Sequence, residues 1–173
     1  LSQSQDLAQV ENFLSSWNHI DAIIHNAGSL LLKPFAQTSV EDFEKIYSVN
    51  VFAVAALTRI ALPYLQKGSH VVTISSMGGI QGSLKFAGLS AYSSSKGAVI
   101  TLSELLAEEY RGQGIAFNVL ALGSVQTEML AEAFPGYQAP IQPKDMAQYI
   151  FDFTLNGNKY YNGKVLQVSS TTP

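Results

Sequence analysis

The chain has 173 residues, of which 47% are hydrophobic and 13% charged, and its formal net charge is −3. This composition is typical of one globular domain with a large core and gives little support to disorder or to nucleic-acid binding. The absence of cysteine excludes disulfides and thiolate ligands, the three histidines lack ligand spacing, and no apolar run approaches the ~20 residues of a membrane span. We therefore expect a cytoplasmic protein without metal, nucleic-acid or membrane partners.

The first part of the chain predicts a helix followed by a buried strand. Apolar residues recur at helical spacing over residues 6–17, and Asp6 is a candidate N-cap. Residues 20–25 are β-branched and nearly all apolar, which is typical of a strand buried on both faces in a parallel sheet. The small triplet Asn26–Gly28 follows at the strand end where open α/β sheets bind ligands, although an ordinary turn uses the same residue types.

A capping box predicts the start of a long second helix. Thr38 is the expected N-cap and Glu41 its reciprocal partner, and an apolar stripe continues to Leu65, with Gly68 as the stop signal. Asn50 lies within this stripe. A buried amide must be hydrogen-bonded, so Asn50 is either a structural tie between helix and loop or part of a site.

The next segment places a phenol and an ammonium on one helix face. Residues 70–76 predict a second buried strand that ends in two serines, and a glycine-rich loop covers residues 77–89. The following helix carries Tyr92 and Lys96, which share a face because they are four residues apart. A lysine beside a tyrosine lowers the tyrosine pKa, and such a phenol can exchange a proton with a carbonyl or alcohol. The same spacing also occurs on solvated helix faces.

The rest of the chain continues the alternation of strands and helices. We expect a strand over residues 115–121, a short helix over 128–134, a helix from Pro143 to about residue 155, and a strand over 165–168. This alternation implies an α/β fold whose parallel strands are joined by right-handed crossovers.

Four features, taken in order, resemble the short-chain dehydrogenase/reductase family. They are Asn26-Ala27-Gly28 after a strand, Asn50 within the long helix, Ser76 after the next strand, and Tyr92 with Lys96. The resemblance implies a Rossmann-like, doubly wound parallel sheet in three α/β/α layers. It also implies an NAD(P)-dependent oxidoreductase that transfers a hydride between the cofactor, NAD or NADP, and a small-molecule carbonyl or secondary alcohol.

The resemblance further implies a role for each site residue. Tyr92 would be the general acid/base, and Lys96 would hold the nicotinamide ribose and lower the tyrosine pKa. Ser76 would bind the substrate oxygen, and Asn50 would hold a water of a proton relay. The implied cofactor-binding residues are Asn26, Ala27 and Gly28 beside the adenine ribose, Gly123, Val125 and Thr127 beside the nicotinamide, and Tyr92 and Lys96 themselves.

Three departures from the family pattern qualify this interpretation. Leu122 stands where the family usually has proline, and the stretch between Ser76 and Tyr92 is longer than usual and includes Lys85-Phe86-Ala87. The Gly-rich turn that meets the cofactor pyrophosphate has no counterpart in the chain. We therefore expect residues 1–173 to be the catalytic part of one NAD(P)-binding domain that lacks its first βαβαβ segment, roughly 60 residues. The choice between NAD and NADP stays open.

Two further questions follow from the resemblance. The missing glycine turn and Leu122 favour an alternative, a non-catalytic cofactor-sensing or scaffold relative of the same fold, whereas the intact set of Asn50, Ser76, Tyr92 and Lys96 favours an enzyme. The family also implies a homodimer or homotetramer that pairs the helices near 40–65 and 91–110.

Apolar side chains in the loops that flank the predicted site indicate a partly apolar substrate: Met77, Leu84, Phe86, Met129 and Phe134.

Overall fold

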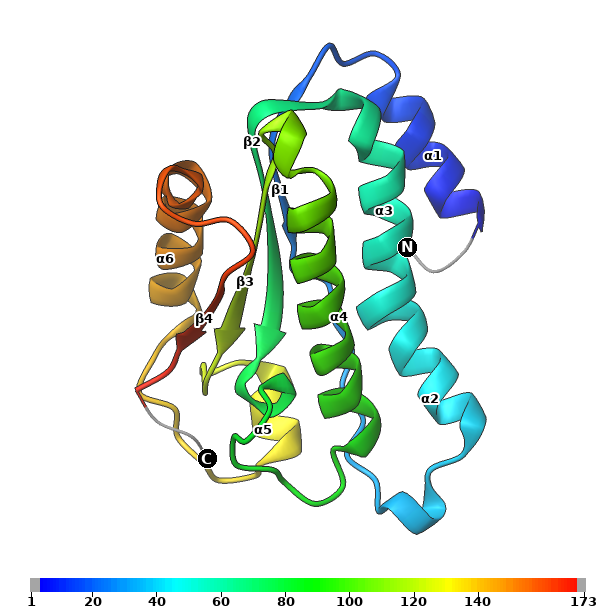
Figure 1. Cartoon of the computed structure of the whole chain (residues 1–173). Coiled ribbons are helices and arrows are strands. Elements are labelled where there is room, and N and C mark those ends of the chain that lie inside the picture. Colours follow the sequence, from blue (N-terminus) through cyan, green and yellow to red (C-terminus); the bar gives the residue numbers. More distant parts are fainter. Residues whose placement is uncertain (1–3, 171–173) are drawn as a thin grey trace.

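The chain forms a four-stranded parallel sheet with helices on both faces (Figure 1). This computed structural model describes residues 4–170. The strands lie in the order in which they occur in the sequence: β1 (Ile20–His25), β2 (Leu65–Ser76), β3 (Ala116–Leu122) and β4 (Val165–Val168). Each neighbouring pair is parallel, so the predicted α/β fold with a parallel sheet is confirmed. Because parallel neighbours need a crossover, a helix returns the chain between successive strands.

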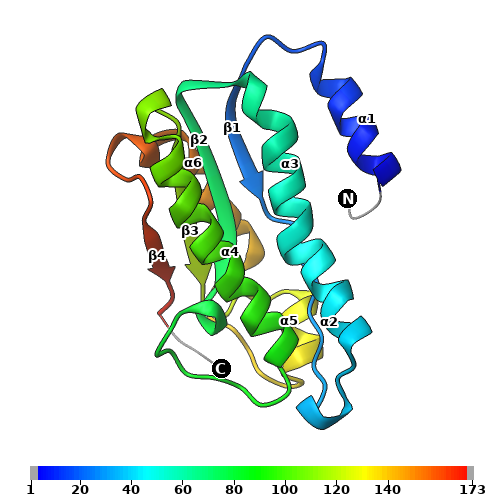
Figure 2. The ribbon, with the colours of Figure 1, turned by 45° about the vertical axis from the view of Figure 1, so that its right-hand side comes forward.

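The helices form an outer layer on each side of the sheet (Figures 1 and 2). One face is covered by α1 (Ser4–Leu14), α2 (Val40–Tyr47), α3 (Ala53–Ala61) and α4 (Ser90–Glu109). The other face is covered by α6 (Pro143–Asn156), and the short α5 (Glu128–Ala133) lies near the carboxyl ends of the strands. All strand carboxyl ends therefore meet at one edge, which is where this class of sheet binds ligands.

The central strands supply the core on both faces. Successive strand residues point to opposite sides, so Val71 packs in the cluster beneath α3 and α4 while Val72 packs with Phe153 of α6. Phe117 and Leu120 of β3 divide in the same way and are almost completely buried. This two-sided burial explains why β2 and β3 read as continuous apolar runs.

The edge strand β1 differs from its expected environment. The sequence predicts burial on both faces, but Asp21 is exposed and the Ile24 side chain retains 40% exposure. Within the described residues, β2 is the only strand that pairs with β1, and the outer edge of β1 has no neighbour. The side chains of Ile23 and Ile24 thus keep apolar surface that the neighbouring strand β2 does not cover.

Two helix starts lie close to, but not at, their predicted positions. The capping box before α2 uses Ser39 and Asp42 instead of Thr38 and Glu41: the Ser39 side chain accepts a hydrogen bond from Asp42 N, and the Asp42 carboxylate accepts one from Ser39 N. Lys33 Nζ also donates to Asp42 at 2.6 Å, which favours this register. Asp6 lies inside α1, so it is not an N-cap.

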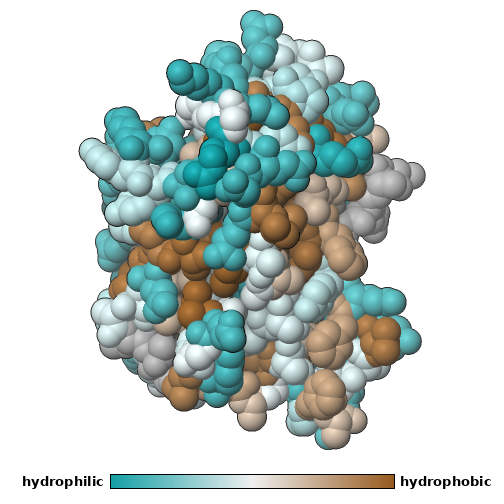
Figure 3. Space-filling model, viewed as in Figure 1, coloured by the Kyte–Doolittle hydropathy of each residue, from teal (hydrophilic) through white to brown (hydrophobic). Residues whose placement is uncertain are grey.

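The second helical stretch is continuous but irregular. A π-helical turn, Ser48–Phe52, separates α2 from α3, and a tight turn, Leu62–Tyr64, ends the stretch. Gly68 lies within β2, so its prediction as the helix stop signal is wrong. Contrary to our expectation, the 25 residues Val40–Tyr64 are long and apolar enough to cross a membrane by length and composition alone. A third of the tested window is buried, and core helices of water-soluble proteins meet the same criterion, so this is weak evidence for a membrane. On the face shown in Figure 3, apolar residues gather mainly across the middle, below an upper part that is mostly hydrophilic.

Candidate active site

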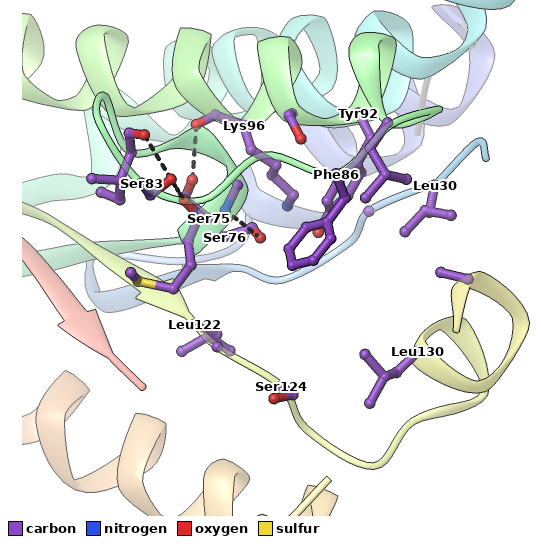
Figure 4. A pocket seen from close by; sticks show the side chains of 18 of the residues that line it. Leu30, Ser75, Ser76, Ser83, Phe86, Tyr92, Lys96, Leu122, Ser124 and Leu130 are labelled. Atoms are coloured by element: carbon purple, nitrogen blue, oxygen red, sulfur yellow. Dashed lines mark hydrogen bonds between the residues drawn. The ribbon is translucent and has the colours of Figure 1, made fainter. Parts of the chain in front are cut away.

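A cavity of about 850 Å³ opens at the carboxyl ends of the strands (Figure 4). Nine of the ten predicted site residues line it: Asn26, Ala27, Gly28, Ser76, Tyr92, Lys96, Gly123, Val125 and Thr127. They come from loops that follow β1, β2 and β3 and from the first turns of α4. Asn50 does not line the cavity and lies buried behind it.

Three of the predicted residues meet at the polar end of the cavity. Ser76 ends β2 in extended conformation, and its Oγ accepts a hydrogen bond from Gly78 N at 3.1 Å. Its side chain also acts on Tyr92 in the direction that lowers the tyrosine pKa. Lys96 Nζ lies 5.9 Å from the centroid of the Tyr92 ring and donates to the Ile74 carbonyl at 2.8 Å. The fold thus brings a hydroxyl, a phenol and an ammonium together.

The pKa of Tyr92 shifts in the opposite direction to our expectation. Burial raises the tyrosine pKa, and the hydrogen bond with Ser76 only partly opposes this effect. Burial also lowers the pKa of Lys96 to about 8. The predicted lowering of the Tyr92 pKa by Lys96 is therefore wrong for the chain as described, because the loss of hydration dominates at this site.

Asn50 is buried next to the cavity and connects two of the segments that form it. It lies in the π-helical turn, where its Oδ1 accepts from Ser29 N at 2.8 Å and its Nδ2 donates both to Ser29 O and to Ser95 Oγ at 2.9 Å. These bonds join the loop after β1 to α4. Asn50 therefore makes a structural tie between helix and loop. One lone pair of its Oδ1 can still accept a further hydrogen bond.

Glycines allow the loops to approach Lys96 closely. A side chain at Gly28 would begin 3.4 Å from Lys96 Nζ and 3.6 Å from Asn50 Oδ1. A Cβ at Gly79 would lie 2.6 Å from the Lys96 backbone carbon, so the loop after β2 rests directly on α4. Ser75 Oγ adds a 2.8 Å hydrogen bond to Lys96 O.

Sequence reasoning missed several of these supporting residues. Ser75, Gly79 and Ser95 each lie within three residues of a predicted site residue, which is the signal that could have found them. His25, directly before Asn26, is buried and hydrogen-bonds to Thr58 Oγ1 at 2.9 Å. Burial lowers its pKa to about 4.

The comparison with known families decides the assignment of this arrangement. Residues 2–138 match the family model described as short chain dehydrogenase. The chain belongs to the short-chain dehydrogenase family. A 3-oxoacyl-(acyl-carrier-protein) reductase of Thermotoga maritima is 27% identical over 172 residues, which cover 92% of this chain and 68% of that protein. Several further oxidoreductases match over only 57–58% of their own length.

Solved structures of short-chain dehydrogenases share the fold. A short chain dehydrogenase from Salmonella enterica serovar Typhi superposes with a TM-score of 0.84 at 25% identity, covering 95% of this chain and 69% of the other. One from Escherichia coli, complexed with NADPH, gives a TM-score of 0.83 at 27% identity, covering 95% and 70%. The Rossmann-like fold expected from the resemblance is thereby confirmed.

Proposed function

We propose that this short-chain dehydrogenase is an NAD(P)-dependent oxidoreductase that converts a carbonyl compound and a secondary alcohol into each other, with Tyr92 as general acid/base. The observation that carries the proposal is that Ser76, Tyr92 and the buried Lys96 line one cavity, with Lys96 Nζ 5.9 Å from the centroid of the Tyr92 ring. Relatives of this chain are named dehydrogenases or reductases, which supports the same reaction class.

The described residues fit the nicotinamide half of NAD or NADP. Within the described residues, Lys96 Nζ donates one hydrogen bond, to Ile74 O. An ammonium group has three N–H donors, so two remain for ribose hydroxyls. Gly28 leaves open space beside those donors that a side chain would occupy. Gly123 and Thr127 also line the cavity, and the Thr127 side chain caps α5. Bound cofactor would supply or accept the hydride.

The chain's own residues would manage the proton. Tyr92 Oη would give a proton to the substrate oxygen during reduction and take one during oxidation. Ser76 Oγ would hydrogen-bond the same oxygen and hold it beside the phenol. Lys96 would carry positive charge near the phenol, and the remaining lone pair of Asn50 Oδ1 would accept a relay water.

Replacement of Tyr92 by phenylalanine tests the proposal. In the full-length protein, Tyr92→Phe should lower kcat about a thousandfold or more while cofactor binding and the unfolding midpoint stay nearly unchanged. Tyr110→Phe, at the other end of α4, is the matched control and should keep activity. If the Tyr92→Phe variant turns over at the wild-type rate, Tyr92 is not the general acid/base.

The second candidate is a cofactor-sensing or scaffold protein without turnover. The raised pKa of Tyr92 and the presence of Leu122 favour it. A nicotinamide fluorescence titration of the full-length protein followed by a carbonyl panel separates the two candidates. Binding without turnover of any substrate would favour the sensor.

We also propose the wider context of the chain. The exposed face of β1 and the partial coverage of relatives support the proposal that residues 1–173 are the catalytic part of a longer NAD(P)-binding domain. We propose a homodimer or homotetramer that pairs the helical stretch ending in α3 and helix α4. Phe52 in the π-helical turn and Leu105 in α4 are exposed there, whereas Ile60 and Leu106 pack on the core. A stable monomer in sedimentation at micromolar concentration would contradict it. Cytoplasmic location and the absence of nucleic-acid or membrane partners stay predictions.

A further inference from the structure

The cavity has two chemically different ends. Its inner end carries Ser76, Tyr92 and Lys96, whereas its outer end is apolar. The outer side chains come from the loop after β2 and from the segment around α5: Ile80, Leu84, Phe86, Met129, Leu130 and Phe134. Figure 4 shows Phe86 and Leu130 projecting toward the cavity from opposite walls. A substrate whose carbonyl lies at Tyr92 must therefore place the rest of its body among apolar side chains.

An aromatic pair joins the two walls. The Phe86 and Phe134 ring centroids lie 5.1 Å apart at an interplanar angle of 74°, an edge-to-face contact. Both rings are half-buried. The two residues are 48 positions apart in the chain, so the tertiary fold brings them into contact.

Hydrogen bonds hold the Phe86 loop in shape from both sides. Ser83 Oγ donates to Met77 O at 2.6 Å, and Lys33 N donates to Gly88 O at 2.9 Å. Leu89 N also bonds to the Phe86 carbonyl. The aromatic wall is thus largely preformed, which limits the entropy lost when a ligand is bound against it.

Charge is absent from the outer end. Among the described residues that line the cavity, Lys96 at the inner end is the only one with a charged side chain at neutral pH. Lys85, on the same loop as Phe86, does not line the cavity and hydrogen-bonds instead to Ile80 O and Ser83 Oγ. A carboxylate or phosphate at the outer end would lose hydration without gaining a partner.

We propose that the substrate is an uncharged carbonyl compound, or the matching alcohol, that carries an aromatic or similarly bulky apolar arm packed against the Phe86–Phe134 pair. This assignment rests on the proposed function of the same site. In the reductive direction the carbonyl carbon gains a hydride from NAD(P)H and the carbonyl oxygen gains a proton from Tyr92. The products are the alcohol and NAD(P)⁺, and Tyr92 regains a proton from solvent.

Three ketones measured with the full-length protein test the substrate class, because their reduction gives secondary alcohols. Acetone has no arm, para-methylacetophenone has an apolar arm, and para-acetylbenzoate has nearly the same shape with a charge at its far end. We expect kcat/KM for para-methylacetophenone to exceed that for each of the other two at least tenfold. Phe86→Leu and Phe134→Leu should lower the para-methylacetophenone to acetone ratio about tenfold, mainly through KM, while Phe151→Leu on α6 is the control.

The outcomes separate this inference from the proposed function. If acetone and the charged ketone are reduced with the same kcat/KM as para-methylacetophenone, the proposed substrate class is wrong and the proposed oxidoreductase function stands. If the Phe86→Leu and Phe134→Leu variants keep the wild-type unfolding midpoint and the wild-type ratio of kcat/KM between the substrates with and without an apolar arm, the aromatic pair does not select the substrate. If the protein binds NADPH and reduces none of the three, both proposals fail.

Discussion

At the scale of single residues, the site is assembled at a cost to stability. Lys96 is 5% exposed, and its pKa of about 8 lies below the ordinary value of 10.5. Below pH 8 the side chain is charged in both states, and the folded state bears the full cost of burying that charge. The cost shrinks as the pH rises from 8 and vanishes above 10.5, where both states are neutral. Its size at neutral pH is roughly 3 kcal/mol.

Lys96→Met should therefore stabilise the protein while abolishing its activity. Removal of the buried charge outweighs the lost hydrogen bond to Ile74 O, so we expect the unfolding free energy to rise by about 1–2 kcal/mol at neutral pH. Urea unfolding measures the change, and Lys45→Met at an exposed site is the control. A destabilised Lys96→Met variant would show that the ammonium contributes net stability.

Buried histidines should make the fold sensitive to acid. Burial lowers the pKa of His25 to about 4 and also lowers that of His70, whose Nδ1 donates to Thr154 O. Above pH 6.5 both residues are neutral in the folded and unfolded states. As the pH falls below 6.5 only the unfolded state gains the protons, so stability falls by roughly 3 kcal/mol for His25 alone by about pH 4.

A histidine variant isolates this effect. In the full-length protein, His25→Gln should lose less stability than wild type between pH 6.5 and 4, as measured by urea unfolding at several pH values. His19→Gln makes the same replacement at an exposed histidine and is the matched comparison. Parallel pH profiles for wild type and His25→Gln would exclude His25 as the cause.

At the scale of elements, periodicity and chain order predicted most of the fold. The four strands and the main helices lie within a few residues of their expected positions, because their apolar patterns reflect burial that the fold provides. The capping box was wrong by one residue because the deciding partner, Lys33, lies in a preceding loop and could not be seen in the local pattern. The burial of β1 was wrong because it depends on a neighbour on its outer edge.

The candidate site was predictable in its members but not in its electrostatics. Ser76, Tyr92 and Lys96 occur at recognisable spacings, and the fold brings them together. The raised pKa of Tyr92 depends on how far the folded chain removes the phenol from water, which residue spacing does not report. The link from Asn50 to Ser29 and Ser95 likewise depends on the π-helical turn.

The loop after β2 should not tolerate a side chain at Gly79. An alanine Cβ would lie 2.6–2.8 Å from backbone atoms of Lys96 and Gly97, so the loop must move away from α4. We expect Gly79→Ala to lower the unfolding free energy by about 2 kcal/mol or more and to lower kcat/KM. Gly112→Ala, where a Cβ meets no atom within 4 Å, should be nearly neutral. Wild-type stability and turnover of Gly79→Ala would contradict the close contact.

At the scale of the whole molecule, β1 tests whether the sheet continues in the full-length protein. Ile24 is 40% exposed in the described structure. If a further segment covers it, Ile24→Lys should cost about 2 kcal/mol or more, because a buried charge would have no partner. Val40→Lys, at a residue 70% exposed, is the control and should change the unfolding free energy by less than about 0.5 kcal/mol. Equal effects of the two substitutions would mean that Ile24 stays at the surface.

The π-helical turn Ser48–Phe52 has a consequence for how the chain could change. Such a turn holds one residue more than a regular α-helical turn, so the two halves of the helix are out of phase by roughly 100°. Deleting one residue there would restore an uninterrupted helix, and the backbone would gain regular hydrogen bonds. The same deletion would swing Asn50 away from Ser29. The deletion would therefore make the helix regular and break the link between Asn50 and the loop after β1.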